Sequence, residues 1–175
     1  MKRFILPLIV IVILSSCGSS KTYLKRADAD RALQDAVKKL DKDKNDVDAL
    51  SAIPVLYSNI KLEHLAKIKN YKSSKDINRF DLLIKEYDAL QNAYNSILNN
   101  SAAFKIVNPQ YFGTELLETK QAAAEATYSA AENYLARQNR DDAKRAYNLF
   151  KRTDKYVTDY KDSKIKCRKL MKKPS

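Results

Sequence analysis

Apolar side chains recur every three or four residues along most of the chain, and this spacing constrains what it can fold into. In segment 77–98 the periodic set is Ile77, Phe80, Leu83, Ile84, Tyr87, Leu90, Tyr94, Ile97 and Leu98. Side chains at these intervals share one face of an α-helix, and no segment alternates with period two for long enough to form a strand. Two glycines in 175 residues are too few for the turns of β-sandwich or Rossmann folds. The sequence therefore predicts an all-α fold.

Helix boundaries follow from the limits of these stripes and from capping residues. The stripes predict helices at 23–40, 47–71, 77–98, 114–137, 140–150 and 162–172. Asp46, Thr114 and Asn139 are predicted N-caps, because their side-chain oxygens can accept hydrogen bonds from free amides in the first turn. The segment 73–76 is predicted to supply the turn and the cap before residue 77.

Two segments depart from the helical pattern. Pro54 lies inside the second predicted helix and removes a backbone hydrogen bond there. We expect either a kink near residues 50–54 or a helix restart with Pro54 in its first turn. Residues 99–113 are predicted to form the longest loop, packed against the body through its apolar side chains. Those side chains are Phe104, Ile106, Val107, Tyr111 and Phe112.

The amino terminus has the layout of an export signal. Lys2 and Arg3 precede an uncharged apolar run over residues 4–14, which is shorter than the about 20 residues of a stable membrane-spanning helix. The run ends in Leu14-Ser15-Ser16-Cys17, with small residues before the cysteine. This ending resembles the lipobox of bacterial lipoproteins. An ordinary cleaved signal with a chance cysteine is the alternative.

The lipobox resemblance implies a domain organisation and an anchor. Residues 1–16 would be the signal peptide, 17–22 a lipidated tether, and 23–173 a single helical domain. Cys17 would become the first residue of the mature chain and carry fatty acyl chains such as palmitate. The membrane would then be a partner through this N-terminal lipid.

One segment resembles a tetratricopeptide repeat, a helix-turn-helix unit of 34 residues. The resemblance covers residues 126–150, and its small and aromatic core positions match without a gap between Ala131 and Phe150, whereas Thr127 stands where the first aromatic is expected. The resemblance implies antiparallel helical hairpins in a right-handed, TPR-like stack. The residues that would form the repeat core are Ala131, Tyr134, Ala143, Tyr147 and Phe150.

Most of the chain is similar to uncharacterised TPR-like outer-membrane lipoproteins of Bacteroidota. The similarity rests on Ser15–Gly18, Tyr23–Arg26, Asp35–Leu40 and Ala143–Tyr147. Surface-exposed lipoproteins of that group usually carry acidic residues after the cysteine, whereas residues 18–21 have none. The resemblance therefore implies attachment to the outer membrane with the domain facing the periplasm.

Positive charge is concentrated near the carboxyl end. Residues 151–175 hold ten cations and three acids, within a chain of net charge +12. Export would separate this segment from nucleic acid, so anionic lipid head groups, envelope polysaccharide or an acidic protein are the expected partners. A solvated helix face is the alternative interpretation. The candidate anion-binding residues are Lys161, Lys164, Lys166, Arg168, Lys169 and Lys172.

The sequence offers no catalytic or metal-binding constellation. His64 is the single histidine, cannot complete a zinc ligand set by itself, and is expected at a helix surface or boundary. The carboxylate pairs Asp141/Asp142 and Glu115/Glu118 fall in first turns, where the helix dipole explains them. Gly-rich phosphate loops, Gly-x-Ser-x-Gly and His-Glu-x-x-His are absent. We therefore expect no enzyme activity, no cofactor, no metal and no small-molecule substrate.

The remaining cysteine and several tyrosines have two possible roles. Cys167 is expected to be a small, partly buried helix residue, with pairing to another chain as the alternative. Tyr23, Tyr156 and Tyr160 lie beside cations and are candidates to face a partner. The tyrosines on helical stripes are expected in the core: Tyr57, Tyr71, Tyr87, Tyr94, Tyr128, Tyr134 and Tyr147.

Together these features predict a protein-binding scaffold or assembly factor, anchored in the cell envelope by a lipid. Stacked helix pairs create a groove that suits a peptide or a partner helix. The alternative is a binder of anionic envelope polymer or lipid head groups that acts through the basic C-terminal helix.

Overall fold

The computed structural model describes residues 20–171, and every element in this part of the chain is a helix, which confirms the all-α prediction. The predicted signal peptide, Cys17 and Lys172 lie outside the described residues. The helices are α1 (Ser20–Leu24), α2 (Ala29–Lys42), α3 (Val47–Ser73), α4 (Arg79–Leu98), α5 (Ser101–Val107), α6 (Gly113–Leu135), α7 (Arg140–Tyr156) and α8 (Ser163–Met171). Within residues 20–171, no helix is long and apolar enough to cross a membrane.

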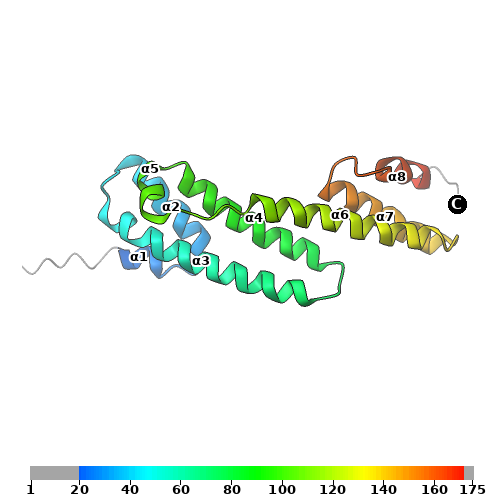
Figure 1. The fold of residues 1–175 in the computed structure, drawn as a ribbon, viewed down its shortest axis with the longest axis horizontal. Helices are drawn as coiled ribbons and strands as arrows, with labels where there is room; N and C mark the ends of the chain where they lie inside the picture. Colours follow the sequence, from blue (N-terminus) through cyan, green and yellow to red (C-terminus); the bar gives the residue numbers. More distant parts are fainter. Residues whose placement is uncertain (1–19, 172–175) are drawn as a thin grey trace, which may run out of the picture.

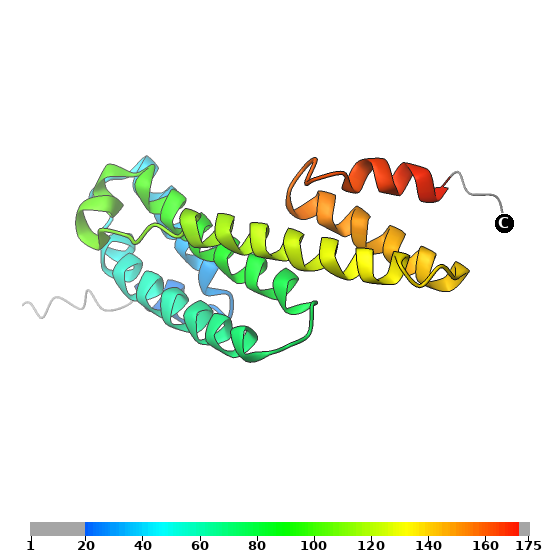
Figure 2. The same cartoon turned by 45° about the vertical axis from the view of Figure 1, so that its right-hand side comes forward.

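The helices build an elongated body (Figure 1). Helices α1, α2 and α5 gather at one end, α3 and α4 run through the middle, and the α6–α7 hairpin with α8 forms the other end. The turned view in Figure 2 shows the same separation of the two ends. The first and last described helices therefore lie far apart.

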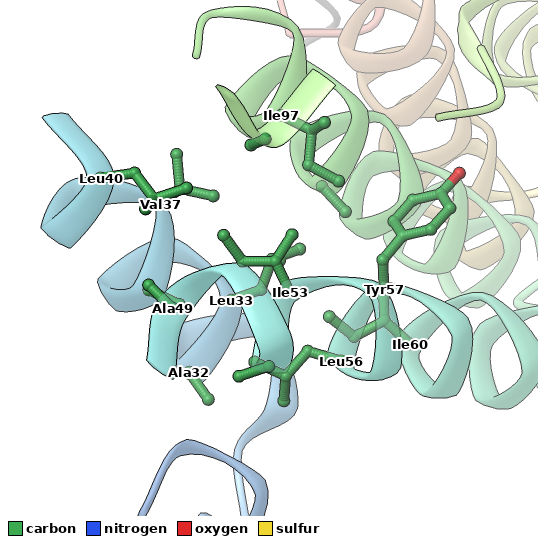
Figure 3. Packing of buried hydrophobic residues seen from close by; sticks show 14 residues of the cluster. Ala32, Leu33, Val37, Leu40, Ala49, Ile53, Leu56, Tyr57, Ile60 and Ile97 are labelled. Carbon is green, nitrogen blue, oxygen red and sulfur yellow. The ribbon is translucent and has the colours of Figure 1, made fainter. Parts of the chain in front are cut away.

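The core consists of three apolar clusters along this body. The first joins α2, α3, α5 and the end of α4; in Figure 3, Leu33, Ile53 and Ile97 converge from three of these helices. The second joins α3, α4, α6 and the end of α7 through Phe80, Leu90 and other residues. The third holds α6, α7 and α8 together. Each cluster is small, and the chain is held together by neighbour-to-neighbour packing.

Two predicted caps are confirmed. The Asp46 carboxylate accepts from the Ala49 amide at 2.8 Å, and the Asn139 side-chain oxygen accepts from the Asp142 amide at 2.9 Å. Asp76 accepts from the Asn78 amide at 2.8 Å, but this closes a turn and α4 begins only at Arg79.

The predicted cap at Thr114 is wrong. Helix α6 already begins at Gly113, and Phe112 precedes it without a side-chain cap. The Phe112 amide instead donates to Gln91 Oε1 of α4 at 3.0 Å. This bond ties the residue before α6 to α4, but it does not cap the first-turn amides of α6.

The predicted single helix at 23–40 is also wrong. Helix α1 ends at Leu24, and a new helix begins after Asp28, whose carboxylate accepts from the Arg31 amide at 2.9 Å. The polar stretch between them gives no apolar face to bury, so capping by Asp28 restarts the helix. Because α1 begins at Ser20, helix also occupies part of the predicted tether.

Pro54 does not restart a helix, because α3 runs without a break from Val47 to Ser73. That alternative is excluded, and the kink near residues 50–54 stays a prediction.

Residues 99–113 are not one loop. Asn100 accepts from the amides of Ala102 and Ala103 at 3.0 and 2.9 Å and starts the short helix α5. Its side-chain amide also donates to Asp41 at 2.8 Å, which ties α5 to the end of α2. Packing of this segment is partial: Phe112 is buried and Val107 half-buried, whereas three of its apolar side chains are exposed. The exposed ones are Phe104, Ile106 and Tyr111.

Candidate functional site: the α7–α8 groove

The α6–α7 hairpin begins the candidate site. Gln138 has a φ of 58°, a left-handed conformation that reverses the chain between the two helices. Asn139 then caps α7, and Asp141 and Asp142 stand in its first turn, where negative charge favours the helix dipole. These local features form a tight turn, which lies at the end of the body opposite α1 (Figure 1).

The predicted repeat core divides into two groups. Ala131 and Phe150 are fully buried, together with Ala146, which lies on the same apolar face of α7. Tyr134, Ala143 and Tyr147 are only half-buried. Ala146 therefore fills the close helix contact, whereas Ala143 and Tyr147 point their exposed parts toward a hollow on α7.

A buried hydroxyl pair occupies the position where a repeat would carry an aromatic side chain. Thr127 of α6 and Thr153 of α7 are both fully buried, and their hydroxyl oxygens lie 2.9 Å apart. Each hydroxyl has a single hydrogen, so one threonine donates to the other. The accepting threonine donates to a carbonyl of its own helix, that of Ala123 for Thr127 or that of Leu149 for Thr153. The pair replaces aromatic packing by a hydrogen bond between the helices.

Helix α8 is held on the hairpin by charged and aromatic contacts. Lys166 Nζ lies 2.8 Å from Glu132 Oε1, 2.9 Å from the Tyr128 hydroxyl and 5.0 Å from the centre of the Tyr128 ring. Burial disfavours its charge, but the bonds to Glu132 and Tyr128 outweigh this and raise the pKa of Lys166. Tyr128 in turn donates to Asp162 at 2.5 Å.

These contacts neutralise half of the predicted anion-binding set. Lys161 pairs with Glu125 at 2.8 Å and Lys164 with Asp159 at 2.8 Å, as Lys166 does with Glu132. Hydrogen bonds from Lys161 and Tyr160 lower the pKa of Glu125 to about 2. Arg168 and Lys169 are exposed without an ion pair in the described part of the chain, and Lys172 lies outside it. The basic helix is thus a less continuous anion-binding surface than its sequence indicates.

The α7–α8 groove is a half-open hollow of about 890 Å³. It lies between the hairpin turn, the first turns of α7 and the end of α8. Its residues are Leu135, Gln138, Asn139, Arg140, Ala143, Lys144, Tyr147, Asn148, Leu170 and Met171. The Tyr147 hydroxyl donates to Met171 Sδ at 3.6 Å and connects the two walls. A hollow of this size is in the range that encloses a small molecule or several side chains of a peptide.

Cys167 lies behind this groove. Its side chain is half-buried, as predicted, and its Sγ donates to the Tyr147 carbonyl at 3.6 Å. Burial raises the pKa of the Cys167 thiol. The residue therefore stays a protonated, weakly reactive thiol at neutral pH.

His64 is the residue that the sequence analysis placed wrongly. It is 7% exposed, and its ring lies between two carboxylates: Nδ1 is 2.5 Å from Glu86 Oε2 and Nε2 is 3.2 Å from Asp30 Oδ2. Lys67 lies 3.9 Å from Glu86 and 2.6 Å from Glu63. The hydrogen bond to Asp30, joined by that to Glu86, outweighs burial and raises the pKa of His64. We call His64, Asp30 and Glu86 the histidine clasp.

The histidine clasp joins three helices and does not form a metal site. Asp30 comes from α2, His64 from α3 and Glu86 from α4. Both ring nitrogens are already engaged by carboxylates, and residues 20–171 contain no group of three side chains arranged to hold a metal ion. A signal was present in the sequence, since residue 64 continues the buried stripe of Tyr57, Ile60 and Ile68.

The tyrosines also divide differently from expectation. Tyr156 is buried, which corrects its assignment as a partner-facing residue: its hydroxyl donates to Asp81 at 2.7 Å and accepts from Arg152 at 2.5 Å. Burial, with the bond to Asp81, raises the pKa of Tyr156 to about 12. Tyr23 and Tyr160 are half-buried. Of the tyrosines expected in the core, Tyr57 and Tyr87 are buried and the others half-buried.

Comparisons of the chain with protein-family models, with curated proteins and with solved structures gave no match.

Proposed function

We propose that the protein is a lipid-anchored scaffold that binds a protein partner in the α7–α8 groove. The observation that carries this proposal is the placement of the two ends of the body. Helix α1 begins three residues after Cys17, and three residues of fully extended chain span at most about 10 Å. The groove lies at the opposite end (Figure 1). A lipid on Cys17 would hold α1 near the membrane and leave the groove accessible.

The proposed body is a TPR-like, right-handed stack of antiparallel hairpins. Its support is the packing of successive helices, in which α2 contacts α3, α3 contacts α4, and α6 contacts α7. Such stacks create extended concave surfaces that bind partners along an open face. The role proposed is therefore binding without catalysis, on the periplasmic side of an outer membrane.

The anchor is tested by Cys17→Ala in the full chain. We expect the wild type to fractionate with membranes and to carry a mass increase at its N-terminus, because the acyl chains attach to the thiol and amine of Cys17. The variant should move to the soluble or unprocessed fraction. Membrane fractionation and mass spectrometry of both proteins measure this. A variant that stays lipidated would contradict the anchor.

The groove is tested by Ala143→Arg, because the long arginine side chain would fill the space that a partner needs. We expect pull-down from detergent-solubilised envelopes to recover a specific protein with the wild type and to lose most of it with Ala143→Arg. Ala66→Arg is the matched control, because Ala66 is exposed on α3 away from the groove. Recovery of the same protein by all three chains would contradict groove binding.

A further inference from the structure

We propose that the α7–α8 groove takes an acidic segment with apolar side chains; this rests on the proposed function and names the chemistry of its partner. The groove floor is apolar, with Leu135, Leu170 and Met171 among its residues. Met171 is 61% exposed, although it lies beside other apolar side chains. When a partner's apolar side chain covers such a floor, apolar surface is removed from water and the free energy of the complex is lowered.

The polar residues of the groove specify the sign of the partner's charge. Among the described residues that line it, two are cations, Arg140 and Lys144, three carry side-chain amides, and none is acidic. Arg140 is exposed and has no ion-pair partner within residues 20–171. Lys144 has a weak partner in Asp141 at 3.7 Å, and both side chains are largely exposed. We call Arg140 and Lys144 the rim of the groove. Lys144 can leave Asp141 and pair with a carboxylate of the partner instead.

The nearest buried acid does not cancel the rim charge. Asp142 is 7% exposed and is already engaged by Asn139 at 2.7 Å, by Arg145 at 3.6 Å and by Arg137 at 3.8 Å. Arg137 and Arg145 also flank the Tyr134 ring, at 4.9 and 5.6 Å from its centre. The turn of the hairpin thus carries more cations than Asp142 can neutralise.

The chain's own carboxyl end is a poor occupant. Lys172 and Lys173 follow Met171 directly in the sequence and carry the same sign of charge as the rim. Placing these cations against Arg140 and Lys144 would cost free energy, whereas an acidic segment would lower it. Complementarity of charge therefore favours a partner over this segment.

The test measures binding of two synthetic peptides by fluorescence anisotropy. One peptide is built from leucine and glutamate, and the other has lysine in place of every glutamate. We expect the full mature chain to bind only the acidic peptide. Raising the salt from about 0.1 M to about 1 M, which shortens the screening length from about 10 Å to about 3 Å, should weaken this binding.

A charge reversal locates the binding. The double variant Arg140→Glu/Lys144→Glu should bind the acidic peptide about tenfold more weakly, because two rim contacts become repulsive. Lys69→Glu/Lys85→Glu is the matched control: it makes the same change in net charge at exposed positions of α3 and α4. Equal loss in both double variants, or equal binding of both peptides by the wild type, would overturn the proposal.

The other occupants give distinct results. If the acidic peptide binds only after removal of residues 172–175, the chain's own end fills the groove and the proposal is wrong. If the rim variant converts a dimer to a monomer in sedimentation, a second copy is the occupant and the proposal is wrong. If Ala143→Arg loses the envelope partner but the rim reversal keeps it, the proposed function stands and the acidic chemistry fails.

Discussion

Phe150→Ala will destabilise the protein by about 3–5 kcal/mol, the usual cost of truncating a fully buried aromatic side chain. Phe150 has no exposed surface and is central to the third apolar cluster. Its ring meets Tyr128 edge to face, with centres 5.5 Å apart, and Lys166 lies 5.5 Å from its centre. Its loss therefore opens a cavity where α6, α7 and α8 meet.

Urea denaturation followed by circular dichroism measures this loss. Ile165→Ala is the matched control on α8, because Ile165 is 50% exposed and its truncation should change stability by only about 0.5 kcal/mol. Phe150→Ala should also release α8 first, since that helix packs only against the α6–α7 hairpin. Similar denaturation midpoints for the two variants would show that the third cluster does not hold this end together.

The histidine clasp will make the free energy of unfolding fall as the pH rises. Because its contacts raise the pKa of His64, the folded protein binds the imidazolium proton more tightly than the unfolded chain does. This contribution is fully present below the unfolded pKa of about 6.5 and is lost as the pH rises through the raised folded value. The groups that face the ring are Asp30 and Glu86, with Lys67 behind Glu86 at 3.9 Å.

His64→Asn should abolish this part of the pH dependence, which urea midpoints across a pH series measure. Glu86→Ala should cost about 3 kcal/mol at about pH 6, where the imidazole carries its proton, because it removes one partner of a buried charge pair. Lys61→Ala, a change on α3 outside the clasp, is the control. Parallel stability curves for the wild type and His64→Asn would refute the clasp as a source of pH dependence.

Capping shows how far local sequence predicts this fold. The caps at Asp46 and Asn139 can be predicted from the sequence because each side chain accepts from the amide three residues ahead, a contact that needs no other part of the fold. The cap predicted at Thr114 is wrong because α6 begins one residue earlier, at Gly113, so Thr114 lies inside the helix and not before it. Asn100 caps α5 through the amides of Ala102 and Ala103, and its side-chain amide also binds Asp41, 59 residues away, a contact that no local pattern predicts.

The residues of the candidate site also fall into two groups, those that a local pattern selects and those that only folding brings together. The sequence selected Ala143 and Tyr147 as repeat residues, and both line the groove. It did not select Leu135, Arg140 or Met171, because these come from three helix ends that only folding brings together. Ion pairs of the basic segment follow the same rule, since Glu125 and Glu132 lie on α6 and pair with Lys161 and Lys166 only when the segment packs there.

The sequence by itself determined that the chain is helical and where several helices begin, because apolar periodicity and capping act over three or four residues. Only the tertiary structure decided that α1 and the groove lie at opposite ends, that His64 is enclosed by Asp30 and Glu86, and that Lys161 and Lys166 of the basic segment are paired with acids of α6. The physical reason is distance along the chain. These contacts join residues that are 22 to 38 positions apart, so helix packing, and no local preference, sets them.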